Sequence, residues 1–288
     1  MVQSTHDVTL GEDHVVKRYR SFDRGELDRE WAALVLLDEH APGLAPAPLE
    51  RRTTDGVPEI VMSRLPGEPL GDAPLTGEQV AAVAVALRAL HAVPLTGTDL
   101  PVRRAGPAEM VAELREWIDE PRTEVDAELG ADVVAALDAA RAWLHGDEAE
   151  RLAGPLVEEV FTLADGNLAN LLWDGERCRV VDFEDSGRSD PAYELADLLE
   201  HVTVWLRGLV DADEMVAALA FTGEQRQRLL GFRTALAVFW LLMLLPGNPG
   251  HHRNPPDSLA RQAARVRGLV RGGPRGTAVQ SGQPHPNG

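Results

Sequence analysis

The spacing of apolar residues divides the chain into a short strand-rich beginning and a longer helical remainder. Residues 8–10 and 14–19 are short apolar runs on either side of a polar turn, and they predict two strands. Between residues 26 and 40 the apolar positions recur with a period near that of an α-helix. Residues 58–65 form another apolar strand, which the Pro66-Gly67 pair ends. The Pro-rich segment 41–50 is expected to be an extended connector.

After Leu70 the apolar residues, many of them Ala and Leu, fall at helical spacing. The predicted helices span residues 76–91, 107–120, 131–145, 192–206, 213–221, 224–245 and 258–270. Thr76 is the expected N-cap of the first of them. Residues 170–173 and 178–183 predict two strands, and the Asp174-Gly175 turn between them indicates a hairpin. Residues 271–288 are rich in Gly, Pro and polar side chains, which is typical of a disordered tail.

Composition excludes several classes of protein. The chain has 288 residues, 44% of them hydrophobic, and a net charge of −18, which is unfavourable for binding the phosphates of a nucleic acid. No apolar segment reaches the roughly 20 residues of a membrane-spanning helix, and the beginning of the chain does not resemble a signal peptide. Cys178 is the one cysteine, so an intrachain disulfide is impossible and a reducing cytoplasm is the expected compartment.

The chemically informative stretch lies around the predicted hairpin. Asp165 precedes Asn170 by five residues, and Asp182 follows the apolar pair Val180-Val181 at the end of the second strand. A hairpin carries Asn170 and Asp182 to the same end of its two strands, with Asp165 on the loop just before them. Two carboxylates and an amide then surround a small space, and oxygen ligands of this kind suit Mg²⁺.

Phosphoryl transfer needs such a set together with a lysine. In that reaction one carboxylate receives the acceptor group, an Asn and an Asp hold Mg²⁺, and a lysine neutralises the nucleotide phosphates. Lys17 follows two apolar residues of a predicted strand, and Glu30 on the next helix could pair with it. Glu26 and Asp28 lie within a turn of Glu30 and are the alternative partners.

At these residues the chain resembles the aminoglycoside phosphotransferase and choline kinase family, relatives of the protein kinases. The stretch LADGNLAN is similar to the family's H-G-D-x-x-x-x-N loop, and VDFEDSGRSDPAYELADL is similar to its metal-binding segment and the following helix. The resemblance runs from Val15 to about Trp240. It implies an α+β, protein-kinase-like fold with a shortened N-lobe over residues 1–66 and a mostly helical C-lobe over residues 67–270.

The resemblance also implies a role for each matching residue. Asp165 would be the catalytic base, and Asn170 and Asp182 would be the Mg²⁺ ligands. Lys17 and Glu30 would form the phosphate-binding pair. The purine ring would be received by a hinge segment made of four consecutive residues, Met62, Ser63, Arg64 and Leu65.

Two departures from the family pattern bear on activity. Leu163 stands where the family has a histidine, which implies a different support for the loop. Only 16 residues precede Lys17, and Gly11 is the one glycine among them, so phosphate binding is expected to depend more on Lys17 and Mg²⁺ than on a glycine-rich loop. Asp185 could face the site or cap a turn. The acidic residues that cluster between 113 and 128 could be a solvated face or line a cleft for a cation.

The leading hypothesis is therefore a small-molecule kinase that transfers the γ-phosphoryl group of ATP or GTP to a hydroxyl. By analogy with the family, the acceptor is expected to be cationic, such as an aminoglycoside-like or peptide antibiotic or an amino sugar, which implies antibiotic resistance. The first alternative is a catalytically weak, nucleotide-binding regulator. A second alternative, a helical interaction protein, requires the spacing of Asp165, Asn170 and Asp182 to be coincidental.

Overall fold

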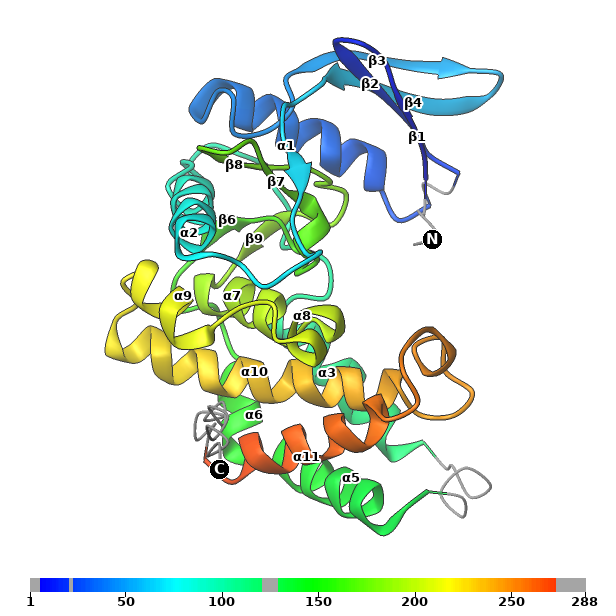
Figure 1. Cartoon of the computed structure of the whole chain (residues 1–288), viewed down its shortest axis with the longest axis vertical. Helices are drawn as coiled ribbons and strands as arrows, with labels where there is room; N and C mark the ends of the chain where they lie inside the picture. Colours follow the sequence, from blue (N-terminus) through cyan, green and yellow to red (C-terminus); the bar gives the residue numbers. More distant parts are fainter. Residues whose placement is uncertain (1–5, 21–22, 121–128, 273–288) are drawn as a thin grey trace, which may run out of the picture.

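The computed structural model describes residues 6–20, 23–120 and 129–272, with a small antiparallel sheet at one end of its long axis (Figure 1). The four strands of this sheet follow the order β1-β2-β4-β3. The helix α1 lies against β3 and β4. The elements are β1 (Asp7–Leu10), β2 (His14–Arg18), α1 (Glu26–His40), β3 (Pro48–Thr54) and β4 (Val57–Ser63). In the register of this sheet Lys17 of β2 lies opposite Ile60 of β4.

Two smaller sheets connect this end of the molecule to the helices. The first has the order β5-β7-β8, and the second pairs β6 with β9. Their strands are β5 (Glu68–Pro69), β6 (Val160–Thr162), β7 (Leu171–Trp173), β8 (Cys178–Val180) and β9 (Gly187–Ser189), and the 3₁₀ turn η1 (Leu168–Asn170) leads into β7. Leu171 pairs with Val180, which confirms the predicted hairpin. The hairpin also bonds to the first part of the chain, because the Val180 N–H donates to the Leu44 carbonyl over 2.9 Å.

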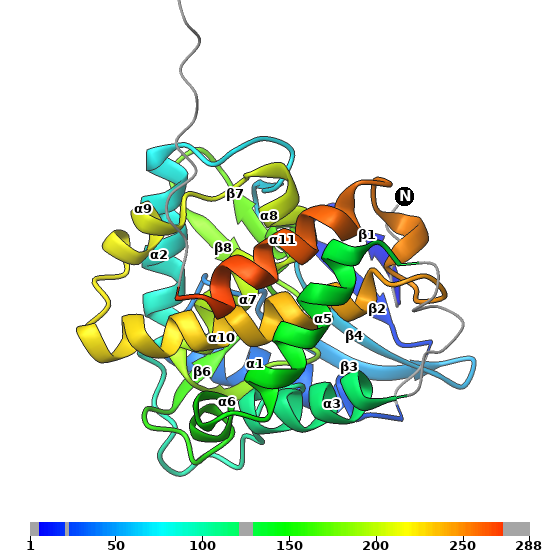
Figure 2. The same cartoon turned by 90° about the horizontal axis from the view of Figure 1, so that it is seen from below.

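Helices make up the other end of the molecule, with α10 running through their centre (Figures 1 and 2). The helix α10 packs against α7, α11 and α3, and α11 packs against α5. The α-helices are α2 (Gly77–His91), α3 (Pro107–Asp119), α5 (Ala131–Leu144), α6 (Asp147–Leu152), α7 (Pro191–Glu200), α8 (Val202–Arg207), α9 (Ala212–Ala218), α10 (Gly223–Met243) and α11 (Ser258–Val270), and η2 (His251–Arg253) is a 3₁₀ turn. Thr76 caps α2 as expected, in a reciprocal capping box with Gln79.

One contiguous apolar core links the two ends. It includes Leu37 of α1 and Ile60 of β4 as well as Leu241 of α10 and Val266 of α11, all nearly or fully buried. Because burial of apolar area is the main stabilising contribution to folding, the sheet and the helices support each other. The mixture of small sheets and packed helices confirms the expected α+β class. The division into lobes at residue 66 stays a prediction.

Two predicted elements were wrong. The helix expected over residues 192–206 breaks at His201, whose ψ of 129° is extended and separates α7 from α8. All of the next three residues, Val202, Thr203 and Val204, are β-branched and favour a helix less than the Ala and Leu before them. The connector expected over residues 41–50 ends in strand β3, which begins at Pro48. Because β3 is an exposed edge strand, its sequence lacks the apolar alternation that predicts a strand.

Two further expectations concern the ends of the chain and membranes. Most of the tail predicted over residues 271–288 lies outside the described residues, which end at 272. None of the helices in the described ranges is both long enough and apolar enough to cross a bilayer.

Candidate active site

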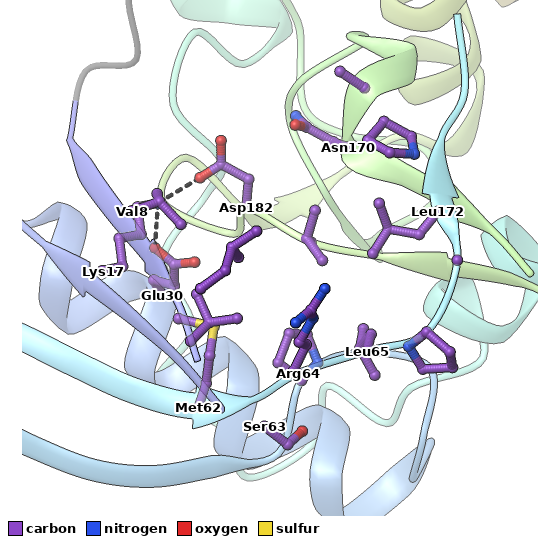
Figure 3. Close-up of a pocket in the computed structure, with 18 of the residues that line it drawn as sticks. Val8, Lys17, Glu30, Met62, Ser63, Arg64, Leu65, Asn170, Leu172 and Asp182 are labelled. Carbon is purple, nitrogen blue, oxygen red and sulfur yellow. Dashed lines mark hydrogen bonds and ion pairs between the residues drawn. The ribbon is translucent and has the colours of Figure 1, made fainter. Parts of the chain in front are cut away.

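A buried lysine and three carboxylates lie together between the first sheet and the hairpin. Figure 3 shows Lys17 with two of them, Glu30 and Asp182. The Lys17 Nζ is 2.7 Å from Glu30 of α1 and 2.8 Å from Glu184, and it also bonds Asp182. Burial disfavours the charged form of this lysine. The three carboxylates outweigh that effect and hold the pKa of Lys17 above its usual value. Lys17 is therefore a fixed positive charge on the floor of the site.

Glu30 is the member of its helix that faces the site. Of the two alternative partners of Lys17, Glu26 pairs with Arg24 and Asp28 pairs with Arg51 on the surface of the sheet. The Tyr19 hydroxyl donates a hydrogen bond to Glu30, and the Phe183 N–H donates to its second oxygen over 3.3 Å. These contacts hold Glu30 in place beside the segment that carries Asp182.

Glu184 is a site residue that the sequence analysis missed. Its carboxylate contacts Lys17 and lies 2.9 Å from the His6 imidazole. Burial raises the pKa of the Glu184 carboxyl to about 7 against the opposing effect of Lys17. The available signal was its position two residues after Asp182, directly behind the strand predicted over residues 178–183. Asp185, which the sequence allowed either to face the site or to cap a turn, pairs with Arg104.

The hairpin brings Asn170 and Asp182 together at its open end. The Val181 N–H donates to the Asn170 carbonyl over 3.0 Å. Because Asp182 follows Val181, this bond places its backbone close to that of Asn170. Asp182 has a φ of 71°, a left-handed conformation that Asp and Asn adopt more readily than most residues. The carboxylates of Glu30, Asp182 and Glu184 each place an oxygen within 4.8 Å of the others, which is a donor set of the kind that Mg²⁺ binds. The role of Asn170 as a metal ligand stays a prediction.

Asp165 lies one side chain away from this set. The Asn170 amide donates to one oxygen of Asp165 over 2.8 Å, and the Asn167 N–H donates to the other over 2.9 Å. Burial and the nearby Asp197 carboxylate raise the pKa of Asp165, while His201 opposes this shift. The structure thus connects Asp165 to the other predicted residues through Asn170.

Gly166 fixes how closely the loop that carries Asp165 approaches α7. A Cβ at residue 166 would lie 2.2 Å from the Asp197 carbonyl oxygen, which is backbone and has no room to yield. The loop and α7 therefore lie in contact, and a side chain at position 166 would separate them.

Glu194 on α7 accepts a hydrogen bond from the backbone beneath the same loop. The Leu163 N–H donates to it over 2.9 Å, and Leu163 itself is buried in the apolar core. Burial raises the pKa of the Glu194 carboxyl to about 7, although Arg103 and the Leu163 N–H both favour its ionised form. The backbone bond to this acid supports the loop at Leu163, the position where the resemblance implies a histidine.

This raised pKa predicts a pH dependence of stability. The folded chain holds the proton of Glu194 up to about pH 7, whereas the unfolded chain releases it near pH 4.5, so the contribution of Glu194 to the free energy of unfolding falls between these pH values. As the pH rises through this range, we expect the free energy of unfolding to fall by about 3 kcal/mol more in the wild type than in Glu194→Gln. Urea unfolding at pH 5 and pH 8 measures it. Glu176→Gln, at an exposed position, serves as the control. If the free energy of unfolding changed equally between pH 5 and pH 8 in all three proteins, the assignment would be disproved.

A cavity of about 460 Å³ lies above the lysine cluster. Val8, Val15 and Met62 from the sheet and Leu172 from the hairpin give it apolar walls, and Lys17, Asn170 and Asp182 line its polar end. The predicted hinge residues line it as well (Figure 3).

Two backbone donors of the predicted hinge are already engaged within the chain. The Ser63 N–H donates to the Ala47 carbonyl over 2.9 Å, and the Arg64 N–H donates to the Asp13 carbonyl over 3.0 Å. A purine ring would have to be received by other groups of the segment.

The acidic cluster predicted between residues 113 and 128 lies only partly within the described ranges. Asp119 pairs with Arg141 and His145, which makes it part of a solvated network on the helices. The residues at 124, 126 and 128 lie outside the described ranges.

Fold and site together define a phosphotransferase of the protein-kinase-like type, and comparison with known proteins agrees. The sequence pattern of the phosphotransferase enzyme family, APH, matches residues 3–232. The chain belongs to this family, which confirms the resemblance, and it is a phosphotransferase that acts on a hydroxyl group. No curated protein has a sequence that matches significantly.

Solved structures share the fold at low sequence identity. A choline/ethanolamine kinase family protein from Mesorhizobium loti is 21% identical with a TM-score of 0.63, over 94% of this chain and 86% of that one. A thermostable mutant of the aminoglycoside phosphotransferase APH(4)-Ia, in a ternary complex with ADP and hygromycin B, is 20% identical with a TM-score of 0.58, over 96% and 93%. The macrolide 2'-phosphotransferase MphH from Brachybacterium faecium is 20% identical with a TM-score of 0.55, over 90% of each chain.

Proposed function

We propose that the protein transfers the γ-phosphoryl group of ATP, or of GTP, to a hydroxyl of a small cationic acceptor. The observation that carries this proposal is the cluster in which Lys17 meets Glu30 and Asp182, with Asn170 and Asp165 next along the hairpin end. A buried lysine, two metal-binding oxygens and a base carboxylate are the groups that phosphoryl transfer requires.

In this proposal each residue has a distinct task. Asp165 accepts the proton of the attacking hydroxyl and orients it toward the nucleotide. Lys17, held by Glu30, neutralises charge on the phosphates, and the apolar walls of the cavity cover the purine ring. Asn170 and Asp182 would hold Mg²⁺, which supplies positive charge to the β- and γ-phosphates when it is bound.

The acceptor is the less specified partner. Net charge of −18 favours a cationic molecule, because an acidic surface raises the local concentration of cations. The structural neighbours named for aminoglycosides and macrolides support an antibiotic acceptor, and hence a role in antibiotic resistance. Cys178, buried and free, is consistent with a reducing cytoplasm.

An acceptor screen tests this proposal. The chain is mixed with Mg-ATP or Mg-GTP and with hygromycin B, spectinomycin, a macrolide, choline or a basic peptide antibiotic. Release of nucleoside diphosphate is followed, and mass spectrometry determines the masses of the acceptor products. We expect one acceptor to gain a single phosphoryl group. Tight metal-dependent nucleotide binding without any transfer would instead support the catalytically weak regulator.

A further inference from the structure

Arg103 is a buried arginine directly beneath the loop that carries Asp165. It lies between α2 and α3, in a segment that runs alongside β9: Val102 bridges Arg188, and the Arg103 N–H donates to the Arg188 carbonyl over 3.0 Å. Its side chain is 4% exposed. Backbone pairing therefore delivers a charged side chain into the interior at this point.

The guanidinium of Arg103 connects three features of the site. Its Nη2 donates to the Ala164 carbonyl over 3.1 Å and to the Asp197 carboxylate over 2.7 Å. The planar group lies over the ring of Tyr193, 4.7 Å from its centroid. Both Asp197 and Tyr193 belong to α7, so Arg103 joins the loop to that helix.

Ala164 is the residue in this loop that needs support. Its φ of 70° is left-handed, which is unfavourable for a residue with a Cβ. Such a conformation persists only where the surroundings impose it. Hydrogen bonds flank Ala164 on both sides, because Glu194 accepts from the Leu163 N–H and Arg103 donates to the Ala164 carbonyl. Asp165 is the next residue along the chain.

We propose that Arg103 is a positioning residue for Asp165: by holding the Ala164 carbonyl against Asp197, it fixes the backbone turn from which Asp165 projects. This inference rests on the proposed function, in which Asp165 receives the acceptor hydroxyl. It also explains how a loop with Leu163 in place of the family histidine keeps a defined geometry.

The chemistry of the contact favours arginine over lysine. A guanidinium presents several donors in one rigid plane, so it can satisfy a carbonyl and a carboxylate while stacking on an aromatic ring. Both hydrogen bonds come from Nη2, and stacking on Tyr193 fixes where that nitrogen lies. A lysine ammonium could neutralise Asp197 but has no plane to stack on Tyr193, so its nitrogen would not be held at the Ala164 carbonyl.

Three variants test the inference. Arg103→Met removes the contacts, and Arg103→Lys keeps the charge beside Asp197. Arg228→Met is the matched control, because Arg228 pairs with Asp190, a second buried aspartate associated with α7. For each folded variant, kcat is measured as ADP release from Mg-ATP, with water or an acceptor from the screen as the second substrate. Calorimetry gives the Kd of Mg-ATP, and hydrogen exchange is followed in peptides covering residues 161–170.

We expect kcat to fall about 10- to 100-fold in both Arg103 variants, the scale of a misplaced catalytic group, with an unchanged Kd for Mg-ATP. Exchange in residues 161–170 should rise in Arg103→Met and not in Arg228→Met. A kcat for the Arg103 variants equal to that of the control overturns the inference, and so does a loss confined to nucleotide affinity. If Arg103→Met does not fold, Arg103→Lys decides.

The two proposals can fail separately. If the wild type turns over Mg-ATP and the Arg103 variants match the control, the positioning role is wrong and the kinase function stands. If the wild type shows no turnover with any acceptor, while loop exchange still rises only in Arg103→Met, the structural contact stands and the proposed function is wrong.

Discussion

Replacing Asp165 with Asn is expected to lower kcat by about 10²–10⁴-fold, the usual contribution of a general base. The amide keeps the size of the side chain, and its oxygen can still accept from the Asn167 N–H, which preserves the local turn. Its nitrogen can no longer accept from the Asn170 amide. What it loses is an oxygen basic enough to take the acceptor proton. Steady-state release of ADP at saturating Mg-ATP measures the change.

Binding and a neighbouring substitution control for damage to the fold. Because Asp165 does not line the nucleotide cavity, the Kd of Mg-ATP for Asp165→Asn should match that of the wild type. Asp174→Asn removes a carboxylate from the turn of the hairpin and should leave kcat unchanged. Activity of Asp165→Asn within tenfold of the wild type would exclude Asp165 as the base.

Asp182→Asn is expected to weaken binding of Mg-ATP by at least tenfold, and by about 100-fold if the carboxylate carries most of the metal contact. Losing an interaction with a charged group costs about 1.5–3 kcal/mol, which corresponds to this range of affinity. Asn tolerates the left-handed backbone of this position as Asp does, so the substitution tests charge and not conformation. Calorimetric titration with Mg-ATP and with ATP in a chelator measures both affinities.

Asp185→Asn is the matched control for that experiment. It lies three residues further along, pairs with Arg104, and carries no role in the site proposed here. The metal-dependent part of the affinity should vanish in Asp182→Asn and persist in Asp185→Asn. A wild-type chain that binds ATP equally well with and without magnesium would refute the assignment of Asp182.

The sequence predicted those parts of the site whose residues lie on one local element or on neighbouring elements of the chain. The Asp174-Gly175 turn predicted the hairpin, and hairpin geometry then placed Asn170 beside Asp182. The position of Lys17 on a predicted strand and the acidic helix after it indicated an ion pair, and the lysine–glutamate pair of kinases favoured Glu30 over Glu26 and Asp28. The roles of these residues stay predictions, whereas their proximity is a feature of the fold.

Other parts of the site depend on contacts between distant segments. Arg103 lies in an irregular connection whose sequence, Val-Arg-Arg-Ala-Gly, carries no motif, and only its pairing with β9 brings it under Ala164. In the sequence, nothing distinguishes Glu194 from the other acidic residues of the predicted helices. Its burial beneath the loop follows from the packing of α7 against β6 and the loop after it, which no local pattern encodes.

The grouping of Lys17 with three carboxylates has a consequence for how the protein would respond to its surroundings. Even with the pKa of Glu184 raised to about 7, carboxylate charge exceeds that of the single ammonium, so the cluster by itself has a surplus of negative charge. The phosphates of a metal-free nucleotide would be repelled there, and only a complex that brings its own cation would be attracted. Nucleotide binding would then depend on the concentration of free magnesium as much as on that of the nucleotide. A fall in either concentration would reduce binding and, with it, phosphoryl transfer.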